Sequence, residues 1–230
     1  MSKKIINKPY DPERNRVNPE HYEQFKDLKP NTNPFYLFFK RAADIVCSFL
    51  ALIVLSPVFL ATAVAVRSDG GPVLFRQIRV GKGGKTFSMY KFRSMVVDAD
   101  KMTENLKNDA GGPVFKMYDD PRVTRVGRFI RKYSIDELPQ LINILKGDMS
   151  IVGPRPALPN EVAMYSDYAA QRLKVRPGLT CYWQCGGRSR ISFDKWIDMD
   201  LEYINDQNLW RDFKIILKTI PAVFNADGAY

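Results

Sequence analysis

Histidine and cysteine are scarce in this chain, and their scarcity disfavours several kinds of site. The 230 residues contain one histidine, His21, and three cysteines, Cys47, Cys181 and Cys185. Three cysteines without regular spacing do not make a disulfide framework, so we expect free thiols in a reducing compartment. A zinc site would have to be assembled from this small set, and His21 lies in a polar tail. The sequence therefore argues against a zinc protein and against a disulfide-stabilised secreted domain.

Two common nucleotide-binding fingerprints are missing as well. Gly81–Gly84 is rich in glycine but lacks the Walker spacing and the strand-to-helix context, so we interpret it as a turn. No glycine-rich βαβ fingerprint is present, and we do not expect a Rossmann sheet. Asp98–Asp100 and Asp198–Asp200 each match a three-residue Asp-x-Asp metal motif. Matches this short are frequent by chance, and such charges usually lie on a solvated surface.

Acidic residues are fewer than basic ones. The chain has 35 Lys and Arg residues and 25 Asp and Glu residues, which gives a formal net charge of +10. This excess implies an anionic partner, which is nucleic acid, an anionic membrane or a phosphorylated substrate. We find no recognisable nucleic-acid-binding motif. An apolar share of 45% suffices for a packed core in one domain. Residues 1–34 are polar and rich in proline, so we expect a loosely ordered extension before a domain at 35–230.

One long uncharged run interrupts this polar chain. It extends from Ile45 to Val66, about 22 residues, which at ~1.5 Å per residue would reach across a hydrocarbon core of ~30 Å. A buried helix of a globular protein is the alternative interpretation, but an uncharged run of this length is unusual there. We therefore predict that the run inserts into a membrane.

The centre and the flanks of the run argue against a straight span. Ser56 and Pro57 interrupt it near its middle, where proline removes a helical hydrogen bond and kinks the axis. The Ser56 hydroxyl can satisfy a backbone group that the break leaves free. Lys40 and Arg41 precede the run and further basic residues follow it, and such flanks favour the cytoplasmic side. We therefore predict a re-entrant hairpin over about residues 40–67 that enters one leaflet and returns.

Downstream of this run the sequence predicts a short hairpin and then several helices. Pro72–Val80 and Thr86–Arg93 are apolar and aromatic segments on either side of the glycine turn. Helices are expected over Met95–Asn108, over a short basic segment with Arg125 and Arg128, over Pro159–Val175, from Ser192 to Ile204 and from Leu209 onward. Leu179–Gln184 is expected to be extended, with a loop at Gly186–Arg190. The predicted fold class is α/β of the α+β kind, a compact, mostly helical domain with a small antiparallel hairpin.

The last of these helices has an apolar stripe with basic residues near its opposite side. The apolar members are Trp210, Phe213, Ile216, Leu217 and Ile220. Packing in the core and contact with a membrane interface explain such a stripe equally well, so both interpretations stay open.

Two adjacent carboxylates, Asp136 and Glu137, lie where a basic turn meets an apolar helix. The buried face of that helix is indicated by Leu138, Leu141, Ile142 and Leu145. Gly147 follows them and predicts the end of the helix. The position of the first helical residue decides what the two carboxylates can do, and two interpretations are open.

In the first interpretation Ser134 and Glu137 form a capping box, which is a purely structural device. In the second, Asp136 lies near the N-cap and Pro139 occupies the first turn, where its missing N–H is harmless. The free N–H groups and the nearby Arg131 then keep the Asp136 carboxylate ionised. An ionised carboxylate in such a place can act as a nucleophile or as a magnesium ligand.

The run from Ser134 to Pro156 resembles the signature of the bacterial sugar transferase family, the monotopic phosphoglycosyl transferases. The similarity extends from about Phe38 to Tyr230, and it includes Lys91–Met95 and the serine–proline break. The resemblance implies transfer of a phosphosugar from a UDP-sugar to undecaprenyl phosphate with release of UMP. That reaction is the first membrane step of exopolysaccharide, capsule or glycoconjugate synthesis. It would take place on the cytoplasmic face of the bacterial inner membrane, in contact with membrane lipid.

The resemblance also implies roles for individual residues. Asp136 would attack the sugar-bearing phosphorus with the help of Mg²⁺ and form an aspartyl phosphosugar, and Glu137 would assist as a base or as metal support. Both carboxylates are the expected metal ligands. The phosphate- and nucleotide-binding residues that it implies are Lys91, Arg93, Arg131, Arg155, Arg176 and Arg188.

Two functions of other classes remain as alternatives. A non-catalytic, membrane-attached assembly or regulatory protein would explain the hairpin but would leave the carboxylates and arginines without a role. A nucleic-acid-binding protein would explain the charge alone, and we do not expect nucleic acid as a partner. The sequence leaves the transferred sugar open, and a homodimer is among the assemblies that it allows. Larger family members have a long N-terminal membrane region that these residues lack, and we expect the chemistry to be kept because every catalytic motif lies downstream.

Overall fold

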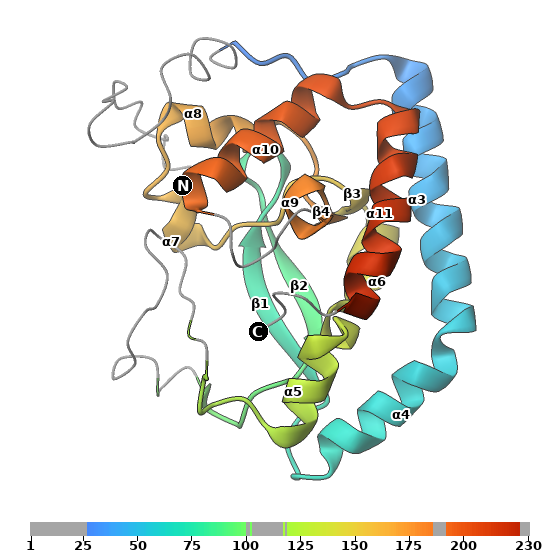
Figure 1. The fold of residues 1–230 in the computed structure, drawn as a ribbon, viewed down its shortest axis with the longest axis vertical. Coiled ribbons are helices and arrows are strands. Elements are labelled where there is room, and N and C mark those ends of the chain that lie inside the picture. The colour runs from blue at the N-terminus through green and yellow to red at the C-terminus, as the bar shows by residue number, and fades with distance from the viewer. Residues whose placement is uncertain (1–26, 100–101, 103–116, 118, 186–191, 226–230) are drawn as a thin grey trace.

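A bent pair of helices, α3 (Pro34–Val54) and α4 (Ser56–Arg67), forms one side of the protein (Figure 1). The computed structural model describes residues 27–99, 102, 117, 119–185 and 192–225. The helices meet at a bend of 63°. The Ser56 hydroxyl donates to the carbonyl of Ile53 at 2.8 Å, so the predicted break and the role of its serine are confirmed. Within the described residues no single helix is long and apolar enough to cross a membrane, whereas the bent pair meets that criterion together.

The two faces of α3 differ in polarity. Tyr36, Asp44 and Ser48 are buried against the rest of the protein. The outward face is apolar and at least 42% exposed at Phe35, Leu37, Phe38, Phe39, Ile45, Val46, Phe49, Leu50, Ile53 and Val54. The helix thus has its polar residues inside and its apolar residues outside. The preceding Leu28, from the predicted polar extension, packs into the main hydrophobic core.

The predicted hairpin is confirmed. Strands β1 (Leu74–Val80) and β2 (Thr86–Phe92) pair antiparallel, with Leu74 opposite Phe92 and Val80 opposite Thr86. Gly83 and Gly84 in the turn have φ values of 66° and 79°, which side chains disfavour. The hairpin lies at the centre of the view in Figure 1, and β2 contacts the helices that follow it in the chain.

A second small sheet was not predicted. Strands β3 (Ser150–Val152) and β4 (Gly178–Thr180) pair in parallel, and α7 (Pro159–Val162), α8 (Asp167–Ala170) and the 3-10 turn Gln171–Lys174 connect them. The predicted single helix over Pro159–Val175 is therefore wrong. Ser166 ends it by capping a new helix, because its side chain accepts a hydrogen bond from the N–H of Ala169.

Two further local predictions need correction. Leu179–Gln184 is extended only as far as Thr180, because Tyr182–Cys185 forms the short helix α9 with Trp183 buried. Met95 begins no helix, since it pairs with Val123 in an isolated bridge. Most of the predicted helix over Met95–Asn108 lies outside the described residues, as does the loop at Gly186–Arg190.

The C-terminal helices complete the core. Ser192 caps α10 (Phe193–Asp206) as predicted, accepting a hydrogen bond from the N–H of Lys195. The buried face of α10 packs with Tyr168 and Trp183 in the largest hydrophobic cluster. Helix α11 (Leu209–Asn225) runs beside α3 (Figure 1). The expected mostly helical domain with a small antiparallel hairpin is confirmed.

Candidate active site

The carboxylate pair lies between two short helices. Helix α5 (Arg125–Lys132) leads into Ser134, whose φ of 55° turns the chain, and Ile135–Glu137 then forms a 3-10 turn. Helix α6 (Gln140–Lys146) begins only after Pro139, which is its N-cap. Neither predicted arrangement is therefore correct, because Ser134 makes no side-chain cap and Asp136 is not the N-cap. Gly147 ends α6 at a φ of 87°, as expected.

A lysine from the hairpin holds the two carboxylates together. Lys91 Nζ lies 2.7 Å from Glu137 Oε1 and 3.8 Å from Asp136 Oδ2. Arg155 Nη1 approaches the same Glu137 oxygen at 3.9 Å from the loop after β3. Asp136 is buried and Glu137 is half-buried. The structure therefore brings together four residues that the sequence predicted to share a site.

Burial and charge act differently on the two acids. Burial raises the pKa of Asp136 above its ordinary range, the Lys91 ammonium opposes this, and the Glu137 charge adds to it. Burial also raises the pKa of Glu137, but Lys91 and Arg155 together outweigh that effect and lower its pKa. Glu137 is thus the first of the pair to ionise. Asp136 is the more basic carboxylate and the stronger nucleophile once ionised.

This arrangement corrects the predicted cause of the ionisation of Asp136. We expected a helix N-terminus to stabilise its charge, and the structure instead surrounds it with Lys91 and, at longer range, Arg131 and Arg155. These cations lower the pKa of Asp136 against the dominant effect of burial. Arg131 comes from the last turn of α5, so its predicted proximity to the carboxylates is confirmed.

A small cleft opens beside the pair. Its walls include Arg79, Lys91, Glu137, Gln140, Arg155 and Gly178. Arg79 was not among the predicted site residues. It is buried, and burial and then the neighbouring Arg155 lower the pKa of its guanidinium to about 10. The alternation of side chains along β1 could have identified it, because Phe75, Gln77 and Arg79 lie on the same inward face of that strand.

Arg93 does not join this cleft. The residue is 6% exposed, and all five of its N–H groups have acceptors in the protein. Nε donates to Pro72 O, one Nη1 hydrogen to Asp69 and the other to Met95 O, while Nη2 donates to Val66 O and Asp69. Arg93 therefore ties β2 to the end of α4, and its contacts do not support the predicted role in phosphate binding.

The remaining predicted arginines are placed differently. Arg176 is exposed just before β4, and within the described residues it is not one of the cations that contact the carboxylates. Arg188 lies outside the described residues. Their proposed contact with a diphosphate thus stays a prediction from the family resemblance.

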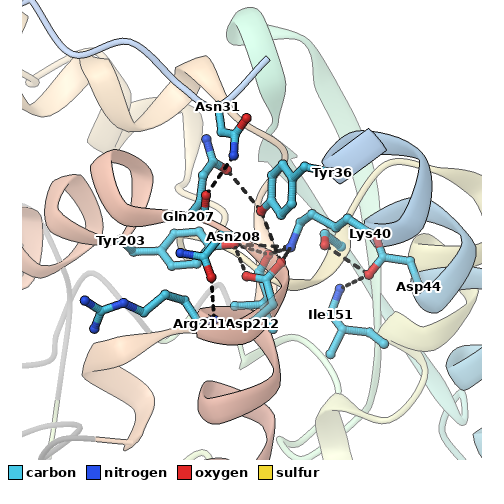
Figure 2. A network of polar contacts seen from close by, with 12 residues as sticks. Asn31, Tyr36, Lys40, Asp44, Ile151, Tyr203, Gln207, Asn208, Arg211 and Asp212 are labelled. Atoms are coloured by element: carbon cyan, nitrogen blue, oxygen red, sulfur yellow. Dashed lines mark hydrogen bonds and ion pairs between the residues drawn. The ribbon is translucent and has the colours of Figure 1, made fainter. Parts of the chain in front are cut away.

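Lys40 and Arg41, the two basic residues before the uncharged run, both contact the rest of the protein, and Figure 2 shows the contacts of Lys40. Lys40 Nζ donates to Val152 O at 3.0 Å and pairs with Asp212 Oδ2 at 2.8 Å. Arg41 donates to the carbonyls of Ile144 and Leu145 at the end of α6. Lys40 and Arg41 therefore anchor α3 to the protein, rather than acting only as a charged flank as we expected.

The same face of α3 also holds the strand that leads to Arg155. Asp44 Oδ1 accepts hydrogen bonds from Ser150 Oγ at 3.0 Å and from Ile151 N at 2.8 Å. Figure 2 shows Asp44, Lys40 and Tyr36 on α3 facing Ile151 and Asp212. Lys40, Arg41 and Asp44 thus connect α3 to α6 and β3, the two elements that flank the carboxylate pair and Arg155.

The carboxylate pair suits one kind of metal ion. Mg²⁺ is commonly bound by one or two carboxylates together with substrate phosphates and water. Glu137 supplies one such group in the cleft wall and the adjacent, buried Asp136 a second, and no cluster of three or more potential ligands is found within the described residues. Asp198 and Asp200 do not form a metal motif, because Asp198 accepts from the Tyr168 hydroxyl and Asp200 pairs with Arg172 at 2.5 Å.

Comparison with known proteins gives consistent matches. A sequence model described as bacterial sugar transferase matches residues 35–226. The galactosyl transferase CpsE of Streptococcus agalactiae is 45% identical over 197 residues, covering 84% of this chain and 44% of that protein. The undecaprenyl-phosphate galactose phosphotransferase of Salmonella typhimurium is 45% identical over 201 residues, covering 84% and 42%. The exopolysaccharide production protein ExoY of Sinorhizobium fredii is 43% identical over 198 residues, covering 83% and 88%. The chain thus spans less than half of the first two relatives and most of the third.

Proposed function

The chain belongs to the bacterial sugar transferase family, and we propose that it transfers a phosphosugar from a UDP-sugar to undecaprenyl phosphate with release of UMP. One observation carries this proposal. A buried, basic carboxylate, Asp136, lies beside an ionised one, Glu137, which lines a cleft together with Lys91 and Arg155. The name of the Salmonella relative mentions undecaprenyl phosphate and galactose, and that of the Streptococcus relative mentions galactosyl transfer, which supports the substrate class.

We propose a covalent first step. An ionised Asp136 oxygen attacks the sugar-bearing phosphorus of the donor and forms an acyl phosphate bond. The bond between that phosphorus and the bridging oxygen breaks, and the electron pair leaves with UMP. Lys91 and Arg155 lie where they can neutralise charge that develops on the phosphate oxygens.

In the second step the phosphate of the lipid acceptor attacks the same phosphorus. The acyl phosphate bond breaks, Asp136 is regenerated as a carboxylate, and a diphosphate-linked sugar is formed. Glu137 is held by Lys91 at 2.7 Å and stays ionised, and its lowered pKa makes it a weak base, so its proposed role is to support the metal ion rather than to accept a proton. Splitting the transfer into two steps lets each anionic substrate meet the enzyme separately.

Asp136 and Glu137 are the residues that would hold Mg²⁺ together with substrate phosphate oxygens. When bound, the ion would supply electrostatic stabilisation of the charge on the phosphates. Lys91, which contacts both carboxylates, would keep them oriented toward the cleft.

The membrane is the proposed second partner. The exposed apolar residues of α3 continue onto α4 at Val58, Leu60 and Val64. On α11 the predicted stripe is largely exposed, with Trp210 at 61% and Phe213 at 49%, which favours a membrane interface over core packing. We infer that α3 and α4 form the re-entrant hairpin, with the domain on the cytoplasmic face of the inner membrane.

The topology can be tested with single cysteines on either side of the bent pair. Thr32→Cys and Ser68→Cys change exposed residues that flank α3 and α4. A re-entrant hairpin leaves both accessible to a membrane-impermeant thiol reagent from the cytoplasmic side only. Labelling of the two positions from opposite sides would indicate a span and contradict the hairpin.

The reaction is tested by measuring UMP release from a panel of UDP-sugars with membrane fractions, Mg²⁺ and undecaprenyl phosphate. We expect release with at least one donor and a loss of at least about a thousandfold in Asp136→Asn, because the nucleophile is removed. Asp119→Asn is the matched control, since Asp119 is 98% exposed. If Asp136→Asn supports polysaccharide synthesis at the wild-type level, the non-catalytic assembly function is correct instead.

A further inference from the structure

Arg79 occupies an unusual position in the cleft wall. It projects from the end of β1, its residue is only 6% exposed, and it lies among the groups that line the cleft with Lys91 and Arg155. Nη1 donates to Pro156 O at 3.0 Å and Nη2 donates to Gln77 Oε1 at 2.6 Å. These bonds fix the guanidinium between β1 and the loop that carries Arg155.

One nitrogen of this buried group has no hydrogen bond at all within the described residues. Arg79 Nε is inaccessible to solvent and has no acceptor within the described part of the chain. A buried donor without a partner costs free energy, so native proteins rarely keep one without a reason. Arg93 shows what a purely structural arginine looks like in this protein, because all five of its N–H groups are satisfied.

The charge of Arg79 is also unbalanced. Within the described residues it forms no ion pair, and the nearby Glu137 is already contacted by Lys91 and Arg155. Three cations, Arg79, Lys91 and Arg155, thus line the cleft with one acid, Glu137, while the buried Glu161 acts on Arg79 from outside the lining. An anion bound there would balance the charge and supply the missing acceptor.

The geometry points to Arg79 as a further substrate-binding residue, which donates its Nε–H to a phosphate oxygen in the cleft beside Arg155. The edge of a guanidinium with Nε–H and Nη–H is suited to bidentate binding of phosphate, and a lysine does not reproduce this fork. Gln77 holds Nη2 in place and thereby orients that edge. The identity of the substrates rests on the proposed function, and the phosphate belongs either to the donor diphosphate or to the lipid acceptor.

The first test measures anion binding without any turnover. Inorganic pyrophosphate is titrated into the purified full chain by calorimetry, using the wild type, Arg79→Gln, Arg79→Lys and Arg76→Gln. Arg76 is the matched control, because it lies three residues earlier on the same strand and is exposed. We expect Kd to rise roughly tenfold or more in Arg79→Gln, to rise less in Arg79→Lys, and to stay unchanged in Arg76→Gln. Absence of binding to the wild type, or equal binding by Arg79→Gln, would overturn the proposal.

The second test assigns the phosphate to a substrate. A rise in KM for the UDP-sugar in Arg79→Gln and Arg79→Lys assigns it to the donor, and a rise in KM for undecaprenyl phosphate assigns it to the acceptor. If the variants lower only the melting temperature and leave both KM values unchanged, Arg79 merely braces Pro156 and the proposal is wrong. If the wild type releases no UMP from any donor but Arg79→Gln still loses pyrophosphate binding, the proposed function fails while the anion site stands.

Discussion

Helices α3 and α10 are built in opposite ways. Helix α10 buries Trp196, Ile197 and Leu201 and exposes Lys195 and Glu202, which is the ordinary pattern of a helix in water. Helix α3 buries a tyrosine, an aspartate and a serine and exposes a continuous apolar face. The two outer faces therefore suit different solvents. The outer face of α10 suits water, and that of α3 suits a membrane.

The inner faces differ in how they are held. Apolar packing and one buried ion pair, Arg172–Asp200, hold α10. Directed polar contacts hold α3, namely Lys40 with Asp212 and Asp44 with the backbone of β3. Such contacts require particular partners at particular positions, so they fix the register of α3 on the domain. A helix with an apolar outer face can thus dock in one orientation and leave that face to lipid.

The largest effect on the free energy of unfolding is expected from Asp200, the buried acid of α10 that pairs with Arg172. Asp200→Asn leaves the guanidinium of Arg172 buried without its anion, which should lower the free energy of unfolding by about 3–5 kcal/mol. Thermal unfolding in detergent measures this. Glu202→Gln on the exposed face of the same helix is the control and should change stability by less than about 0.5 kcal/mol. Similar melting temperatures for the two variants would contradict the assignment of α10 to the stabilising core.

A smaller effect, and on a different quantity, is expected from the outer face of α3. Phe49 is 56% exposed, so Phe49→Ser should leave stability in detergent nearly unchanged. It should weaken membrane association by about 1.5–3 kcal/mol, because the phenyl ring no longer enters lipid. Flotation with liposomes of anionic lipid measures the bound fraction.

Met164→Ser is the matched control for this change. Met164 is 60% exposed and follows α7, which lies on the opposite side of the protein from α3 in Figure 1. Its replacement should leave flotation unchanged. Equal losses in the two variants would show that association does not depend on the face of α3.

A third and smaller effect is expected where α3 meets the domain. Lys40→Met removes the partner of Asp212, but Tyr36 and Tyr203 still donate to that carboxylate. We therefore expect a loss of about 1–3 kcal/mol in the free energy of unfolding, with faster hydrogen exchange in α3. Lys195→Met on the exposed face of α10 is the control. Unchanged exchange in α3 would mean that Lys40 does not anchor the helix.

Local patterns predicted the elements that local forces determine. The turn at Gly83, the helix end at Gly147, the cap at Ser192 and the break at Ser56 each depend on residues close in sequence, and each is confirmed. Proximity of Lys91 to the carboxylates was predicted only through the family resemblance, because β2 and the 3-10 turn meet through tertiary packing.

The predictions that the structure revised concern residues whose partners are distant in the chain. From the sequence, Lys40 and Arg41 are interpreted only as a basic flank, but their partners, Asp212 and the end of α6, lie more than a hundred residues away in the chain. Arg93 is interpreted as a phosphate-binding cation, but it contacts Asp69, 24 residues earlier. Pro159–Val175 reads as one helix, but the chain there turns so that Arg172 reaches Asp200. Charge pairing between distant residues is not visible in periodicity. Arg79 was missed for another reason, since its signal is the alternation of β1, which places it on the inward face.

The smallest expected effect is on the pH dependence of the reaction, and it distinguishes two buried acids. These are Asp136, beside the cleft, and Asp200, on the buried face of α10. Burial raises the pKa of both, but only Asp136 must be ionised for the proposed transfer. The proportion of ionised Asp136 falls as pH falls through its raised pKa of about 6, so the first burst of UMP from the donor should slow about twofold between pH 8 and pH 6. A free aspartate, with a pKa of about 3.9, would show no loss in that range. A burst with donor alone avoids titration of the lipid phosphate. Glu137→Gln removes a neighbouring negative charge that raises the pKa of Asp136, so the normalised profile of burst rate against pH should move to lower pH. A flat profile for the wild type would contradict a raised pKa of Asp136.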